Sequence, residues 1–220
     1  MSAHTFSDCR YSAFFSYAHA DDTAWRRWVT HFCYEFEMGL GAVLHGVTLP
    51  KVHLSGKNGP INGPLNDALR RNIEDSFAMV VFVHDGYLHS QWCLQEIQHF
   101  RELFGDEGFR HRLFIVAMSR PAIEDLCRRP SWRELFPAGD QVWMPFFQPD
   151  DDERPLDVYA QIRRDNAIVS DAFWDKFEPL RRRLRDIIRA ALSAEQQAQS
   201  FPSVRAADGV CLGLLSGQVE

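Results

Sequence analysis

The stretch FAMVVFVH, residues 77–84, is apolar at almost every position. A strand with one face in water alternates apolar and polar residues, whereas a continuous apolar run is typical of a strand covered on both faces of a parallel sheet. We therefore expect this stretch to be a central strand. Its apolar run from Ala78 to Val83 is far shorter than the ~20 residues that a membrane-spanning helix needs, so no contact with a membrane is expected.

Four more strands and several helices are predicted on both sides of this stretch in the sequence. Short apolar runs that end in turn residues predict strands at residues 11–17, 47–54, 113–118 and 142–147. Helical spacing of apolar residues predicts helices from Asp22 to Phe36, at 65–75, from Ser90 to Phe104, at 121–136 with a break at Pro130, and at 172–192. Strands that alternate with helices predict an α/β fold. We expect a flavodoxin-like five-stranded parallel sheet of order 2-1-3-4-5, with helices on both faces.

Composition limits the classes of function. The 220 residues allow one globular unit with a tail, and the net charge of −6 disfavours direct binding to nucleic acid, which needs clustered Lys and Arg. The basic cluster at 181–185 lies in a helical pattern and is interpreted as a solvated helix face. The five cysteines include no CxxC pair, so free thiols and no metal site are expected. With no signal-peptide pattern at its N-terminus, the protein is expected to be cytoplasmic.

Ligands of such α/β folds lie beyond the carboxyl ends of the strands. Three segments at these ends resemble the Toll/interleukin-1 receptor (TIR) domain family. FFSYAHADD at 14–22 resembles the family's first strand and the acidic start of its first helix, and the Gly- and Pro-rich loop 54–64 resembles the mobile loop beside the nucleotide pocket. SQWCLQEI at 90–97 resembles the signature S-x-W-C-x-x-E. The resemblance covers residues 8–192 and leaves 193–220 as a linker or disordered tail.

The resemblance implies which residues form the site. The glutamate of the signature, here Glu96, is the catalytic carboxylate of the members that cleave NAD+, and Trp92 is a candidate to stack on a flat ring of the substrate. Ser16 and the backbone of Phe15 and Tyr17 stand where the first strand ends, and they are candidates to contact the ribose or diphosphate. Their alternatives are structural: a solvated Glu96, an aromatic core residue at Trp92 or Phe15, and a turn that begins at Ser16.

Two other residues of this region have simple interpretations. Lys57 in the Gly-rich loop is a candidate to balance the diphosphate charge, with plain solvation as the alternative. Cys93 is interpreted as a packed thiol, because nothing near it in the sequence would lower its pKa.

Cleavage of the nicotinamide–ribose bond produces an oxocarbenium-like centre that a nearby carboxylate stabilises. Nicotinamide leaves without being protonated, so one glutamate suffices. No phosphate-binding G-x-x-x-x-G-K-[ST] or G-x-G-x-x-G motif is present, and NAD+ is therefore expected to be a substrate, with no cofactor. The expected products are nicotinamide and either ADP-ribose or a cyclic ADP-ribose.

Two functions from different classes follow from the resemblance. The first is an NAD+ glycohydrolase that is activated by self-association through TIR–TIR contacts, in the setting of prokaryotic anti-phage defence. The alternative is an adaptor that pairs with other TIR domains without chemistry. The sequence contains no evident sensor domain, so an activating partner or a fused sensor is left open.

Overall fold

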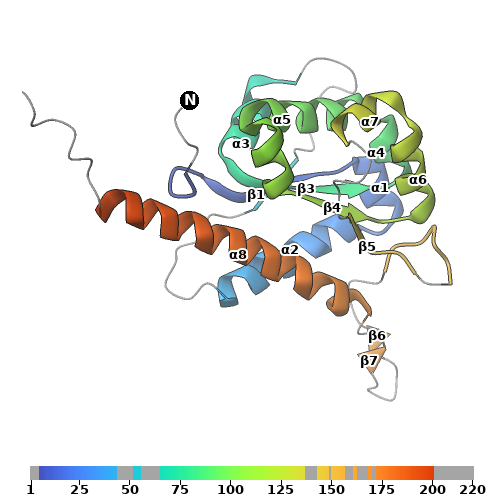
Figure 1. Ribbon diagram of the computed structural model, residues 1–220. Helices are drawn as coiled ribbons and strands as arrows, with labels where there is room; N and C mark the ends of the chain where they lie inside the picture. The colour runs from blue at the N-terminus through green and yellow to red at the C-terminus, as the bar shows by residue number, and fades with distance from the viewer. Residues whose placement is uncertain are drawn as a thin grey trace, which may run out of the picture.

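The computed structural model describes residues 5–43, 52–55, 65–136, 143–148, 150–156, 161–162, 168–169 and 172–200. Its centre is a parallel sheet of five strands in the order β2-β1-β3-β4-β5 (Figure 1). These strands are β1 (Tyr11–Ser16), β2 (Val52–Leu54), β3 (Ser76–Val83), β4 (Leu113–Ala117) and β5 (Trp143–Pro145). A separate antiparallel pair consists of β6 (Gln161–Ile162) and β7 (Ile168–Val169). The predicted flavodoxin-like sheet of order 2-1-3-4-5 is confirmed.

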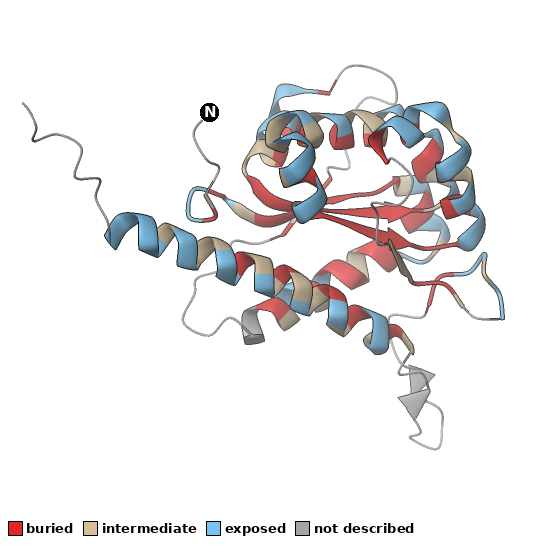
Figure 2. Ribbon diagram, viewed as in Figure 1, coloured by how far each residue is buried: buried red, intermediate tan, exposed pale blue. Residues whose placement is uncertain are grey.

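The apolar strand β3 lies in the middle of the sheet, as its sequence predicted. All eight of its residues are buried, and it pairs in parallel with β1 on one side and with β4 on the other. Figure 2 shows the buried strands enclosed between layers of helices. A strand with neighbours on both edges and helices on both faces has no position where a polar side chain reaches water, which explains its unbroken apolar run.

Helices cover both faces of the sheet (Figure 1). They are α1 (His19–Ala24), α2 (Trp28–Val43), α3 (Asp67–Glu74), α4 (Asp85–His89), α5 (Gln91–Arg112), α6 (Arg120–Arg128), α7 (Pro130–Leu135) and α8 (Ala172–Ser200). Helices α2 and α8 share one apolar core with one face of the sheet. Helices α3, α5, α6 and α7 share a second core with the other face. The short helices α1 and α4 follow β1 and β3, at the carboxyl edge.

Aromatic rings fill the core between α2, α8 and the sheet. Phe32 of α2 is fully buried, and its ring centroid lies 5.0 Å from that of Phe177 on α8 and 5.1 Å from that of Phe82 on β3. Phe146 and Phe173 also pack against it, at 5.4 and 5.8 Å. Phe32 thus joins both layers of this core, which the apolar spacing of α2 and α8 predicted.

The first predicted helix is interrupted in the structure. The pattern from Asp22 to Phe36 indicated one helix, but α1 ends at Ala24 and α2 begins at Trp28. Between them Arg26 and Arg27 have φ angles of 56° and 63°, in the left-handed region that non-glycine residues seldom adopt. The buried Asp22 carboxylate explains the break, because it accepts hydrogen bonds from the backbone N–H groups of Val29 and Thr30 at 2.7 and 3.2 Å and so caps α2.

The remaining helices confirm one expectation and correct another. The break predicted at Pro130 is present, since α6 ends before it and α7 begins at it. Helix α8, in contrast, continues eight residues past the predicted end at Leu192, to Ser200. The added residues are mostly exposed and rich in Ala, Gln and Glu. These residue types are strong helix formers, so the helix continues without an apolar stripe. Residues 193–200 are therefore helical, the division into a domain and a linker or tail from residue 193 stays a prediction, and residues 201–220 lie outside the described part of the chain.

The extended end of α8 also holds the N-terminal segment. The Glu195 carboxylate accepts hydrogen bonds from the backbone N–H of Phe6 and from the hydroxyl of Ser7. The Phe6 ring packs edge-on against Phe77, with centroids 5.0 Å apart. Within the described ranges, no helix is long and apolar enough to span a membrane.

We expect Phe32→Ala to lower the free energy of unfolding by about 3–5 kcal/mol, because it leaves a cavity where the layers of this core meet. Urea unfolding followed by circular dichroism measures this change. Tyr34→Ala on the same helix is the matched control, since the Tyr34 side chain is 58% exposed, and it should change the stability by less than about 1 kcal/mol. Equal losses in the two variants would contradict the packing described here.

Candidate functional site

The candidate site is built on the first turns of α5. The Ser90 hydroxyl accepts a hydrogen bond from the Cys93 backbone N–H at 3.2 Å, so the predicted N-cap of this helix is confirmed. The cap fixes the start of α5 directly after α4, at the carboxyl edge of the sheet. Glu96 then points inward from the second turn, and it is 1% exposed.

Each oxygen of the Glu96 carboxylate accepts a hydrogen bond from a serine. Ser16 Oγ donates to Oε2 and Ser55 Oγ donates to Oε1, both at 2.5 Å. Ser16 ends β1, and Ser55 directly follows β2. The parallel pairing of Phe15 with Leu54 places these serines side by side, and the Ser55 backbone N–H donates to the Phe15 carbonyl at 3.0 Å. The register of β1 and β2 therefore places the hydroxyl groups of Ser16 and Ser55 beside the carboxylate of Glu96.

Tyr87 extends this network by one residue. Its hydroxyl lies 3.0 Å from Ser16 Oγ, and the whole residue is buried. Ser16 uses its only proton to bind Glu96, so Tyr87 is the donor in this contact. The result is a chain of O–H groups that runs from Tyr87 through Ser16 to Glu96, in which each bond polarises the next.

Asp21 fixes the position of Tyr87. Its carboxylate accepts hydrogen bonds from the backbone N–H groups of Gly86 and Tyr87, at 3.0 and 2.9 Å. A Cβ atom at position 86 would lie 2.6 Å from Asp21 Oδ1, so this close approach requires glycine. The acidic residues that follow β1 thus hold α4 in place, and α4 carries Tyr87 toward Ser16.

His84 lies on the other side of Asp21. Its Nδ1 lies 3.3 Å from Asp21 Oδ1, which allows charge attraction but is not aligned as a hydrogen bond. The Trp25 indole N–H donates to Nε2 at 3.3 Å. Burial lowers the pKa of His84, but the nearby Asp21 carboxylate, together with Glu153 and Asp85, raises the pKa above its ordinary value. His84 therefore belongs to the support of the site. No group of three potential metal ligands occurs in the part of the chain that the structure describes.

Burial sets the charge of Glu96. Removal from water raises its pKa from the ordinary 4.5 to about 7, although the hydrogen bonds from Ser16 and Ser55 act in the opposite direction. Near neutral pH the side chain is divided between its acid and carboxylate forms. Cys93, one turn before it, is also buried, and burial raises the pKa of this thiol well above its ordinary value. The interpretation of Cys93 as a packed thiol is confirmed.

The structure separates the other residues that the sequence singled out. Phe15 is fully buried in the core, where its ring packs against Phe36 and Phe82, and a substrate contact by its backbone stays a prediction. Trp92 lies half-buried on α5, four residues before Glu96. Tyr17 is buried beside His19, with ring centroids 4.9 Å apart. Substrate contacts by Trp92 and Tyr17 stay predictions, and Lys57 lies outside the described residues.

Sequence reasoning did not identify Ser55, Tyr87 or Asp21 as members of the site. Ser55 could have been found, because it directly follows the second predicted strand and that strand neighbours the first. Tyr87 gives no signal of its own in the sequence. Its role depends on the placement of α4, which Asp21 determines from 66 residues away.

The raised pKa of Glu96 predicts how stability depends on pH. A group whose pKa rises on folding favours the folded state in its protonated form, so its contribution is complete below pH 4.5 and is lost as the pH rises through about 7. Glu96→Gln removes this dependence. We expect the variant to gain about 3 kcal/mol relative to the wild type over this pH range.

Chemical unfolding of both proteins at a series of pH values tests this expectation. Glu102→Gln removes an exposed carboxyl from the same helix and is the matched control. If the difference in stability between Glu96→Gln and the wild type did not change with pH, burial would not raise the pKa of Glu96 in the folded protein.

The chain is similar to known proteins of one domain family. The model of the TIR domain family matches residues 14–159. No curated protein sequence gives a significant match. Among solved structures, the chain is similar to the TIR domains of the activated Roq1 resistosome, which directly recognizes the pathogen effector XopQ. Sequence identity is 15%, 88% of this chain and 99% of that chain are covered, and the TM-score is 0.40. The family match spans β1 to β5 and includes the helix that carries Glu96, and the chain therefore belongs to the TIR domain family.

Proposed function

We propose that this TIR domain cleaves the nicotinamide–ribose bond of NAD+, with Glu96 as the catalytic carboxylate. The observation that carries the proposal is the position of Glu96: a buried carboxyl group at the carboxyl edge of a parallel sheet, held by Ser16 and Ser55. Ligands of such sheets bind at this edge. A raised pKa at such an edge is typical of a functional group.

The proposed reaction uses the carboxylate as a fixed negative charge. When nicotinamide leaves, positive charge develops at the ribose carbon, and a carboxylate with little water around it stabilises that charge more strongly than an exposed one. Ser16 keeps one carboxylate oxygen oriented throughout. Water then attacks the cation to give ADP-ribose, or a group of the nucleotide attacks it to give a cyclic product.

Substrate binding requires a change in the hydrogen bonds of Glu96. Both oxygens already accept a hydroxyl group, and a ribose carries hydroxyls of the same kind. We propose that a ribose hydroxyl replaces Ser55 as the donor to Oε1, which leaves the bond from Ser16 in place. The exchange conserves the number of hydrogen bonds to the buried carboxylate, so its cost is small.

The alternative function is a TIR–TIR interaction module without chemistry. The observation that favours it is the same enclosure of Glu96, which at 1% exposure and with both oxygens bonded also fits a purely structural carboxylate. In that case Glu96 holds β1, β2 and α5 together. The two functions differ in whether the wild-type protein releases nicotinamide from NAD+ at all.

We place the proposed enzyme in the cytoplasm, in prokaryotic anti-phage defence, where loss of NAD+ or a cyclic product would halt the infected cell. Neither a cofactor nor a metal is part of the proposed reaction. The proposed trigger is an activating partner or a fused sensor that brings TIR domains together. Lys57 and Trp92 are the further proposed contacts to the diphosphate and to a ring of NAD+.

We expect purified protein at high concentration to release nicotinamide from NAD+, and Glu96→Ala and Glu96→Gln to lower the rate about a hundredfold to a thousandfold, as for other preorganised charges. The wild-type rate should rise with pH through about 7, because the carboxylate form is the active one. Liquid chromatography with mass detection identifies nicotinamide and the nucleotide product. Glu102→Gln is the control. No release by the wild-type protein would favour the interaction module, and normal release by Glu96→Gln would rule out Glu96 as the catalytic carboxylate.

Self-association should control the activity. We expect the rate per molecule to increase with protein concentration, in parallel with the fraction of oligomer measured by light scattering, because the proposed active form is an assembly and the monomer has low activity. The measurement is nicotinamide release over a wide concentration series, repeated with a crowding agent. A rate per molecule that stays constant while the oligomer forms would rule out this control.

A further inference from the structure

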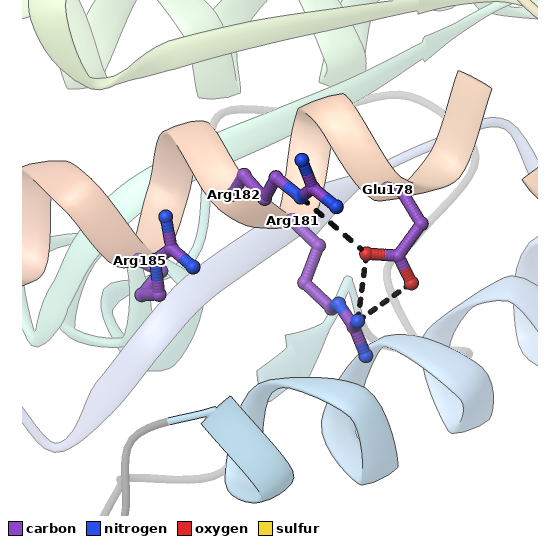
Figure 3. A pocket seen from close by; sticks show the side chains of 4 residues that line it. All are labelled: Glu178, Arg181, Arg182 and Arg185. Atoms are coloured by element: carbon purple, nitrogen blue, oxygen red, sulfur yellow. Dashed lines mark hydrogen bonds and ion pairs between the residues drawn. The ribbon is translucent and has the colours of Figure 1, made fainter. Parts of the chain in front are cut away.

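An arginine-lined hollow lies on α8, on the face of the sheet opposite to α5. Figure 3 shows its four lining residues, Glu178, Arg181, Arg182 and Arg185, which follow one side of the helix. The hollow has a volume of about 240 Å³. Since α8 belongs to the core of α2 and Glu96 belongs to the other layer, this hollow is separate from the candidate active site.

The hollow has an excess of positive charge. The Glu178 carboxylate accepts two hydrogen bonds from Arg181, at 2.6 and 2.7 Å, and lies 3.9 Å from the Arg182 guanidinium. Arg185 binds its neighbour Asp186 at 2.7 Å. Three guanidinium groups therefore face two carboxylates, and one positive charge is left uncompensated among these side chains.

Several guanidinium N–H groups also have hydrogen-bonding capacity to spare. Each arginine has five N–H donors and no acceptor, which is more than Glu178 and Asp186 use. Arg181 Nε is buried and has no hydrogen-bond partner among the described residues. Arg182 is the most exposed of the three, with 68% of its side chain accessible. The guanidinium donors of Arg182 are therefore within reach of a ligand from solvent.

Helix α2 makes room for one of the arginines. The Arg181 side chain crosses α2 at Gly39, where a Cβ atom would lie 2.3 Å from Nη1 and 2.9 Å from Cδ. The side chain is only 17% exposed, and Glu178 holds the same guanidinium group through Nη2. Arg181 is thus fixed before any ligand arrives, and a ligand that binds it loses less side-chain entropy than one that must order a free arginine.

We propose that this hollow binds a phosphate group, either inorganic phosphate or the monoester group of a small molecule. A phosphate monoester carries about −1.5 to −2 charges and three terminal oxygens, which suits two or three guanidinium groups that approach from one side. The planar fork of arginine matches phosphate oxygens in pairs. In the proposed complex Arg182 and Arg185 bind the phosphate directly. Arg181 holds Glu178 in place, and its positive charge attracts the phosphate without contact.

Isothermal titration calorimetry with inorganic phosphate, in a buffer without other multivalent anions, tests the proposal. We expect binding at millimolar concentration that weakens with added NaCl, and a loss of affinity of about tenfold or more in Arg182→Gln/Arg185→Gln, because each charged hydrogen bond contributes substantially. Arg128→Gln is the matched control: an exposed arginine of α6 that also pairs with a glutamate one turn away, Glu124.

Two further titrations identify the ligand class and separate this site from the active site. Adenosine monophosphate should bind about as well as phosphate, whereas adenosine should give no heat. Glu96→Gln should bind phosphate like the wild type, whatever it does to nicotinamide release. Absence of phosphate binding by the wild type, or equal binding by the double variant with an unchanged circular dichroism spectrum, would overturn the proposal.

Discussion

A carboxylate that leaves water loses its hydration, and the folded protein must supply other hydrogen bonds in exchange. Glu96 meets this requirement with two neutral hydroxyl groups. The exchange works only if β1 and β2 are in register and Ser90 caps the start of α5 at Gln91. The position of one carboxyl group therefore constrains two strands and a helix together. The pKa of Glu96, raised to about 7 in spite of both bonds, shows that hydroxyl groups replace water incompletely.

The sheet and its layers could be predicted because they depend on patterns that are local in sequence. An unbroken apolar strand, the apolar stripes of the helices and Ser90 at a helix start all act within a few residues. Glu96 could be named because its neighbours Trp92 and Cys93 resemble a known signature. The residues that hold Glu96 could not be named together, because Ser16, Ser55 and Tyr87 meet only after the strands have paired.

Two errors in the predicted helices have the same physical origin. Periodicity measures which residues face the core, but it does not measure hydrogen bonds to distant side chains or intrinsic helix propensity. The Asp22 carboxylate captures the N–H groups of Val29 and Thr30 and so divides a regular apolar pattern. The end of α8 is helical without any pattern, because its residues favour the helix on their own. The Phe15 side chain lies in the core, which is the structural alternative that its position near the end of the first strand left open.

The bond between Glu195 and the backbone of Phe6 has a consequence for how the molecule can be connected to others. It brings the first and last described segments together beside the start of β1, at the amino edge of the sheet (Figure 1). Circular permutation tolerates such neighbouring ends well, so a short linker could join them and new ends could be opened elsewhere. Chain that directly precedes Thr5 or directly follows Ser200 therefore joins the described part of the molecule at this amino edge. The candidate site with Ser16 and Ser55 lies at the opposite, carboxyl edge of the sheet.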